Sequence, residues 1–203
     1  EMAYENFVPL TNLNFQFNRL LSNGPEGCRE EELWEIAPHL TEFNEDLWYE
    51  QWHKLAQRAQ SQGRFMHGAY YHRMSEFFLS DQHPEKNASY KDFQRCFYEA
   101  VRERTLEKVT VPYGEAGLPA IRIKARREKG VVLLHGGFDS FMEEFYLSLR
   151  PLPGLGYTVI AFEGPGQGRA LRHGLKMDHC WEKAVGAVLD FFDLQGVCLI
   201  GIS

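Results

Sequence analysis

The sequence predicts a helical region over residues 1–105, followed by an α/β domain with a largely parallel sheet over residues 106–203. Three observations lead to this fold class. Apolar residues recur every three or four positions in the first half. Short continuous apolar runs replace that spacing near residue 106, and glycine-rich turns follow these runs. With 203 residues, 44% of them hydrophobic, the chain is long enough to bury a sizeable core.

Five helices are predicted before residue 106. Apolar residues at helical spacing place them near residues 15–21, 30–36, 48–59, 66–78 and 90–101. The helix-breaking residues 23–25 separate the first two. Asn44 is expected to cap the third helix and Gly63 to end it. Ser89, with Asp92 three residues later, is expected to cap the last one.

From Leu106 the pattern changes to strands. Alternating residues on either side of a turn at 113–117 predict a hairpin with one solvated face. Three continuous apolar strands follow, at residues 131–134, 158–162 and 197–202. Helices are expected between them, at residues 141–149 and 178–194. Continuous strands that alternate with helices predict a parallel sheet covered on both faces.

Composition excludes several classes of function. The formal charge of −6 lies entirely in residues 1–105, and no basic stripe suited to phosphate groups is present, so nucleic-acid binding is not expected. No apolar run approaches the roughly 20 residues that span a bilayer, and no signal peptide is visible, so no membrane span is expected. The four cysteines lie far apart without CxxC pairing, which favours a reducing, cytoplasmic setting over a disulfide framework or a zinc knuckle.

The residues after each parallel strand form the candidate site, because ligands bind at the carboxyl ends of such strands. Residues 135–140 follow the first strand and read His-Gly-Gly-Phe-Asp-Ser. Two glycines there let backbone N–H groups face a ligand, as in an oxyanion hole, and they suit a plain strand-to-helix turn equally well. The third strand ends at Gly-Ile-Ser, residues 201–203. This is the first half of the G-x-S-x-G turn that raises a nucleophilic serine above the sheet.

The turn after the second strand reads Glu-Gly-Pro-Gly-Gln-Gly over residues 163–168. It lacks the Lys-Ser/Thr of a phosphate-binding loop. It is also not expected to open directly into a helix, as a dinucleotide-binding fingerprint would. A nucleotide site is therefore not expected.

No histidine in the sequence is expected to act as the catalytic base. His135 is interpreted as structural. His67 and His72 are five residues apart, a spacing that does not suit two metal ligands on one helical face, so no metal site is expected. Asp178 is interpreted as a helix N-cap, with His179 in the first turn of that helix.

Charged and aromatic side chains near the site are expected to be mainly structural. The acidic residues at 139, 143 and 144 are in reach of the glycine turn, and solvated or capping roles are favoured for them. Most aromatic residues of helices 66–78 and 90–101 are expected in the core, with a few free to line a pocket for a flat aromatic substrate.

The three turns, in this order, resemble those of α/β hydrolases. Residues 134–140, 162–168 and 201–203 are similar to one branch of that superfamily. It contains 2,6-dihydroxypseudooxynicotine hydrolase, fungal chain-shortening polyketide hydrolases of pigment and melanin synthesis, and fermentation-respiration switch proteins. Residues 47–52 and 68–78 resemble its N-terminal helical domain, which packs over the active site. The resemblance implies the N-terminal half of an α/β-hydrolase sheet, preceded by a helical domain.

The resemblance also implies roles for individual residues. Ser203 matches the nucleophile, and the backbone N–H groups of Gly137 and Phe138 match the oxyanion donors of the first turn. In this fold the acid, the histidine and another oxyanion donor follow the serine. The 203 residues are therefore expected to be an inactive part of a protein about twice as long, with a domain boundary at 105/106. No cofactor is implied.

The implied activity is that of a serine hydrolase. It would cleave a carbon–carbon bond next to a ketone in a small aromatic or polyketide substrate, as in polyketide chain shortening for pigment synthesis. A carboxylesterase would share every visible motif, and a non-catalytic regulatory or binding protein on a hydrolase scaffold is the rival from another class. A truncated pseudoenzyme is not favoured, because its last buried strand would lack the following helix. The exact substrate and the oligomeric state, including a homodimer, stay open.

Overall fold

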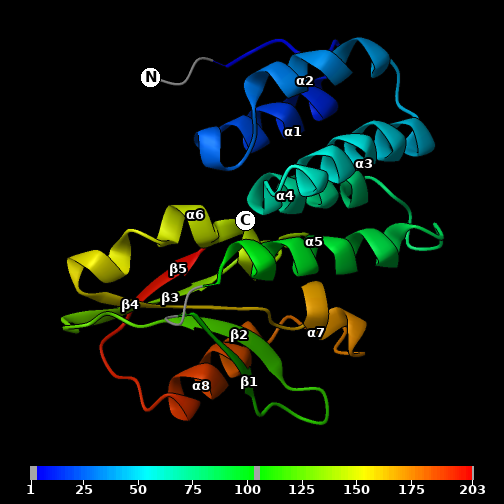
Figure 1. Cartoon of the computed structure of the whole chain (residues 1–203). Coiled ribbons are helices and arrows are strands. Elements are labelled where there is room, and N and C mark those ends of the chain that lie inside the picture. The colour runs from blue at the N-terminus through cyan, green and yellow to red at the C-terminus, as the bar shows by residue number, and fades with distance from the viewer. Residues whose placement is uncertain (1–3, 103–105, 203) are drawn as a thin grey trace. The chain divides into compact units, whose positions relative to one another are not determined.

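The computed structural model describes residues 4–102 and 106–202 (Figure 1). Contacts between residues divide the chain into two compact units, residues 1–102 and residues 103–203. The first unit is helical and the second is built on a mixed sheet. Within the described ranges, no helix combines the length and the apolar character needed to cross a membrane.

The helical unit contains the five predicted helices and two short 3₁₀-helices, written η. Its elements are α1 (Thr11–Leu21), η1 (Gly24–Glu26), α2 (Glu30–Ile36), η2 (Ala37–His39), α3 (Glu45–Ser61), α4 (Phe65–Phe77) and α5 (Lys86–Ala100). Asn44 caps α3 as predicted, because its Oδ1 accepts a hydrogen bond from the Leu47 N–H at 2.9 Å. The prediction for Ser89 is wrong. The helix α5 begins three residues earlier, and Ser89 is buried within it.

The core of the helical unit forms where α1, α3 and α4 meet. Trp48 and Trp52 lie one turn apart on α3 and are both buried, with ring centroids 6.0 and 5.0 Å from that of Phe17 on α1. The helix α4 packs against both α3 and α5, so it is buried on almost every side. It therefore has to pair its own charged residues, and Arg73 contacts Glu76 at 2.6 Å.

The second unit contains a five-stranded sheet with the order β1-β2-β4-β3-β5. Its strands are β1 (Leu106–Val111), β2 (Leu118–Ile123), β3 (Gly130–His135), β4 (Tyr157–Phe162) and β5 (Cys198–Gly201). The pairs β3–β4 and β3–β5 are parallel, as predicted, and the β1–β2 hairpin joins β4 in antiparallel fashion. The predicted solvated face is present on β1 only. Both faces of β2 are largely buried, because Leu118 and Ala120 pack with side chains of α8 on one face and Ile121 packs with Met142 and Leu149 on the other.

Short helices connect the strands and cover both faces of the sheet. They are η3 (Met142–Phe145), α6 (Tyr146–Leu149), η4 (Leu152–Leu155), α7 (Gly168–Arg172) and α8 (Trp181–Phe191). Side chains of α8 pack with Leu133 and Ile160 on one face, whereas Met142 and Leu149 pack with Val159 on the other. Figure 1 shows α6 and α8 on opposite sides of the sheet. The prediction of a sheet covered on both faces is confirmed for its central strands.

Three details of these connections differ from the predictions. The helix expected at 141–149 is split into a 3₁₀ turn and a single α-helical turn. The next helix, α8, begins at Trp181 with Cys180 at its N-cap, so Asp178 is not the cap; its carboxylate accepts a hydrogen bond from the Cys180 N–H instead. The turn at 163–168 leads straight into α7, contrary to the expectation that no helix would follow directly.

Candidate active site

The turns after β3 and β4 start side by side, because the parallel register pairs His135 with Phe162. The end of β5 lies against the same place, since the Ile202 N–H donates to the His135 carbonyl at 3.1 Å. All three predicted site segments therefore meet at the carboxyl edge of the parallel strands. Ser203, the predicted nucleophile, follows Ile202 directly and lies outside the described residues.

The turn after β3 requires glycine at its first position. A Cβ on Gly136 would lie 2.6 Å from Cβ of Ser140 and 2.8 Å from a ring carbon of Phe145, which is closer than a side chain tolerates. Gly137, the next residue, is partly exposed, and the Phe138 side chain is 77% exposed. The predicted oxyanion residues thus lie at the accessible end of a tightly packed turn.

Gln167 connects this turn to the turn after β4. Its buried side-chain nitrogen Nε2 donates to the carbonyl oxygens of Gly136 and Gly137, at 2.6 and 2.7 Å. Its Oε1 accepts from the Gly164 N–H at 3.1 Å. These partners fix which end of the amide is nitrogen, because the carbonyls can only accept and the backbone N–H can only donate.

Glu163 is the second buried polar residue of the turn after β4. Its Oε2 accepts from the Arg169 N–H at 2.6 Å, and its Oε1 accepts from the Met142 N–H at 3.3 Å. Burial, and then the charge of Glu143, raise the pKa of Glu163 to about 8, while the two backbone hydrogen bonds oppose this shift. The turn is also closed around this carboxyl group, since a Cβ on Gly168 would lie 2.0 Å from its Oε1.

The acidic residues after β3 behave differently from one another. Asp139 is exposed. Glu144 has a capping role, as expected, because its Oε2 accepts from the Phe141 N–H at 2.8 Å. Glu143 contradicts the expectation of a solvated or capping residue, because its side chain is fully buried beside Glu163.

His135, His67 and His72 each have local partners. The ring of His135 packs against Trp181 and Phe162, with centroids 4.9 and 5.9 Å away, which suits the structural role predicted for it. His67 Nε2 lies 2.9 Å from a backbone carbonyl, and His72 Nε2 lies 2.9 Å from the Gln60 amide oxygen. Burial lowers the pKa of His72 to about 3, so this ring is neutral at physiological pH.

Two other features bear on metal and redox chemistry. Asp178, His179 and Cys180 place donor atoms within 4.8 Å of one another in the loop before α8, where the His179 side chain is almost entirely exposed. This is the single group of such spacing in the part of the chain that the structure describes. The four cysteines are all free thiols, and burial raises the pKa of Cys28 to about 12 and that of Cys96 to about 11.

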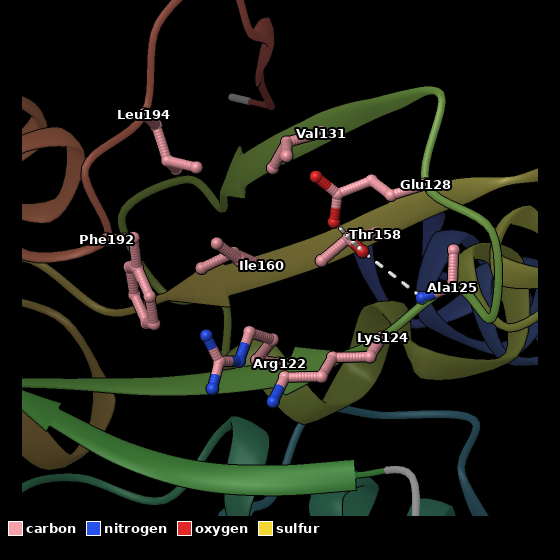
Figure 2. A pocket seen from close by; sticks show the side chains of 9 residues that line it. All are labelled: Arg122, Lys124, Ala125, Glu128, Val131, Thr158, Ile160, Phe192 and Leu194. Atoms are coloured by element: carbon pink, nitrogen blue, oxygen red, sulfur yellow. Dashed lines mark hydrogen bonds between the residues drawn. The ribbon is translucent and has the colours of Figure 1, made fainter.

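A pocket of about 260 Å³ lies at the other end of the strands (Figure 2). Figure 2 shows Val131 and Thr158, which lie near the beginnings of β3 and β4, on its wall, with Thr158 hydrogen-bonded to Glu128 and to the Ala125 N–H. Arg122 also lines it and is held by an ion pair with Glu107 of β1. The pocket contains none of the predicted site residues, so it is separate from the candidate site.

Known proteins were compared with the chain by sequence and by structure. No family model matches it. It is 32% identical to the 20-hydroxy-prefusarin hydrolase FUS2 of Gibberella moniliformis over 94% of this chain and 54% of the relative. It is 30% identical to the α/β hydrolase ucsC of Acremonium sp, over 89% of this chain and 44% of the relative.

Two solved structures share its fold. AbyA5 superposes with a TM-score of 0.73 at 15% identity, over 93% of this chain and 55% of AbyA5. The 2,6-dihydroxy-pseudo-oxynicotine hydrolase superposes with a TM-score of 0.68 at 17% identity, over 90% of this chain and 57% of that one. This chain has the fold of the α/β hydrolases. The predicted α/β-hydrolase fold is thereby confirmed, and the relatives found by sequence and by structure are consistent with the predicted branch. The chain spans about half the length of the curated relatives it matches.

Sequence reasoning missed Gln167 and Glu163 as members of the candidate site. Their glycine-rich turn superficially resembles a phosphate-binding loop. Its polar residues form no short sequence motif that would mark them as part of a site. The partners of Gln167 lie in the turn after β3, and only the pairing of β3 with β4 brings the two turns together.

Proposed function

We propose that the protein is a serine hydrolase that cleaves a carbon–carbon bond next to a ketone in an aromatic or polyketide substrate. The observation that carries the proposal is the meeting of the glycine turn at Gly136–Gly137 with the end of β5 at Ile202, one residue before Ser203. A nucleophilic serine at the end of that strand and N–H donors in that turn are the two parts that acyl transfer needs.

In the proposed reaction, the Ser203 hydroxyl attacks the ketone carbonyl, and a histidine base takes up its proton. The N–H groups of Gly137 and Phe138 stabilise the negative oxygen of the tetrahedral intermediate. That intermediate collapses to an acyl-serine as the carbon–carbon bond breaks, and the histidine returns the proton to the departing carbon. Water then hydrolyses the acyl-serine. The products are a carboxylic acid and the protonated carbon fragment. The base and its acid partner are proposed among residues that follow Ser203.

The names of two similar proteins support hydrolysis of a small organic molecule. One relative is a 20-hydroxy-prefusarin hydrolase and one structural neighbour is a 2,6-dihydroxy-pseudo-oxynicotine hydrolase. The exposed Phe138 side chain, 77% accessible at the oxyanion turn, places an aromatic surface next to the proposed reacting carbonyl. Such a surface suits a flat, unsaturated substrate better than a charged one.

Reaction with a fluorophosphonate tests the nucleophile in the full-length protein. We expect stoichiometric labelling of the wild type and none of Ser203→Ala, with Ser140→Ala as the matched control that keeps its label. Labelling of Ser203→Ala at the wild-type rate would show that another residue is the nucleophile. No labelling of the wild type favours a non-catalytic protein on this scaffold.

Substrate preference separates carbon–carbon cleavage from ester hydrolysis. We expect kcat/KM for an aryl β-diketone to exceed that for a short-chain aryl ester, because the diketone offers a stabilised carbanion as the leaving group. Rapid ester turnover with no cleavage of the diketone would identify the protein as a carboxylesterase and contradict the proposed carbon–carbon bond cleavage.

A further inference from the structure

One buried side chain holds both peptide groups of the predicted oxyanion turn. Gln167 Nε2 lies 2.6 Å from the Gly136 oxygen and 2.7 Å from the Gly137 oxygen, so each hydrogen of the amide nitrogen has one carbonyl acceptor. With only 2% of the residue exposed, water does not compete strongly for these bonds.

The direction of a carbonyl sets the direction of the N–H group in the same peptide. The peptide bond is planar, and no described bond is cis, so the oxygen and the hydrogen point to opposite sides. The Gly136 oxygen therefore fixes the Gly137 N–H, and the Gly137 oxygen fixes the Phe138 N–H. Because both oxygens face Gln167, both N–H groups face away from it, towards the accessible side of the turn.

The glutamine is itself held at a fixed position. Its Oε1 accepts from the Gly164 N–H at 3.1 Å and its own N–H donates to the Gly164 carbonyl at 3.0 Å. The turn beneath it has little room to move, since a Cβ on Gly164 would lie 2.5 Å from the Trp181 ring. The Gly166 N–H also donates to the Leu175 carbonyl at 2.9 Å. The side-chain amide of Gln167 thus links the rigid turn after β4 to the turn after β3 and fixes the orientation of the latter's carbonyl groups.

We propose that Gln167 is a positioning residue that orients the N–H groups of Gly137 and Phe138 towards the oxyanion of the transition state. This inference rests on the proposed function. Donors that are already aligned need no reorganisation when charge develops on the substrate, which is the origin of oxyanion stabilisation. Gln167 itself does not touch the substrate.

Three substitutions separate the donor from the shape of the side chain. Gln167→Met keeps the length and removes the donors, and Gln167→Glu replaces them with an acceptor that repels both carbonyls. Gln167→Asn keeps the amide on a shorter chain and serves as the conservative variant. Gln195→Glu is the matched control, because Gln195 is exposed just before β5, at the opposite end of the sheet from the turns.

The readout is transition-state binding, measured on the full-length protein. We would measure kcat and KM for a short-chain nitrophenyl ester, and the inhibition constant of phenylboronic acid, which forms a tetrahedral adduct with a nucleophilic serine. Fluorophosphonate titration gives the concentration of folded sites. For Gln167→Met and Gln167→Glu we expect kcat per site to fall about 10- to 100-fold, and boronate binding to weaken by a similar factor, with KM almost unchanged. Gln167→Asn should recover part of the loss, and Gln195→Glu should behave as wild type.

The outcomes separate this inference from the proposed function. If the wild type neither reacts with fluorophosphonate nor hydrolyses the ester, the proposed function fails and the inference fails with it. If the wild type is active and the titrated sites of the Gln167 variants keep the wild-type kcat and boronate affinity, only the inference is overturned. If the Gln167 variants have a lower melting temperature but an unchanged kcat per site, Gln167 has a structural role only, and the inference is likewise overturned.

Discussion

The carboxyl group of Glu163 is buried, where an ionised group is destabilising. Its surroundings reduce this destabilisation. Two backbone N–H groups donate to its oxygens, and a second carboxyl group, that of Glu143, lies beside it. Among the described residues, Arg169 on α7 interacts electrostatically with Glu163, and Lys108 on β1 interacts with Glu143. Two buried carboxylates that share one region do not both ionise easily, so the pair retains a proton near neutral pH.

This pair makes stability depend on pH in a defined direction. The pKa of Glu163 is about 8 in the folded state and near the ordinary glutamate value of 4.5 when unfolded, so the folded state holds the proton more tightly. The stabilisation is fully present below about pH 4.5 and is lost as pH rises through about 8. Urea unfolding between pH 5 and 9 should therefore show a falling free energy of unfolding.

Removal of the neighbouring charge should weaken this pH dependence. Glu143→Gln leaves a neutral group beside Glu163, so the pKa of Glu163 should fall and the slope should become shallower. Glu182→Gln is the matched control, because Glu182 is exposed on α8, and it should keep the wild-type slope. An unchanged slope in Glu143→Gln would show that Glu143 does not act on Glu163.

Two glycines allow a paired test of the turn around Glu163. Gly168 has a φ of +39° and no room for a Cβ, so Gly168→Ala should cost about 3 kcal/mol or more through backbone strain and disrupted hydrogen bonds. Gly186 lies within α8 with no atom near its missing Cβ, so Gly186→Ala should stabilise the protein by roughly 0.5–1 kcal/mol. Thermal unfolding measures both, and equal effects of the two variants would contradict the packing described for Gly168.

At this scale, sequence reasoning works where a residue acts through its immediate neighbours. Gly137 and Phe138 could be proposed because the resemblance to α/β hydrolases places oxyanion donors in the turn after the first parallel strand. Gln167 and Glu143 could not, because their partners come from other turns and their burial depends on the assembled sheet. A buried acid is also a rare outcome, so a solvated role was the reasonable expectation for Glu143.

At the scale of single elements, α3 shows which local signals suffice. Its apolar spacing and its Asn44 cap predicted both the helix and its first residue. Asn44→Ala leaves the Leu47 N–H without this acceptor and should lower the free energy of unfolding by about 1 kcal/mol. Asn44→Asp keeps a carboxylate oxygen at the cap and should remain close to wild type. Urea unfolding followed by the helical circular dichroism signal compares the two, and equal loss in both variants would argue against capping.

Elements whose boundaries depend on tertiary contacts were predicted less well. The five long or amphipathic helices of the first unit and the parallel strands carry strong periodicity, and they were placed within a few residues. The segments after β3 and around Asp178 are short connections, where backbone hydrogen bonds to the neighbouring turns decide the geometry. The alternating pattern of β2 predicted one solvated face, but α8 covers one face and the segment 142–149 covers the other.

At the scale of the whole molecule, the helical unit has a core of its own. Phe17, Trp48 and Trp52 are all buried and their rings contact one another, and the unit needs no strand to complete a hydrogen-bonded element. We propose that residues 1–102 form an independent domain and expect that segment, expressed alone, to be helical and to unfold cooperatively in urea. A non-cooperative, partly helical product would show that the unit needs the rest of the chain to fold.

The sequence distance between paired elements sets an order of events during synthesis. In the helical unit, α3, α4 and α5 pack against their neighbours in sequence, and local contacts of this kind form rapidly. The central strand β3 must wait for β5, since Val132 pairs with Cys198. Domains fold as units, with the N-terminal one first as the chain leaves the ribosome. The helices should therefore be folded while the sheet still lacks β5, and a pause in translation before residue 198 would leave one edge of β3 open to pairing with another chain.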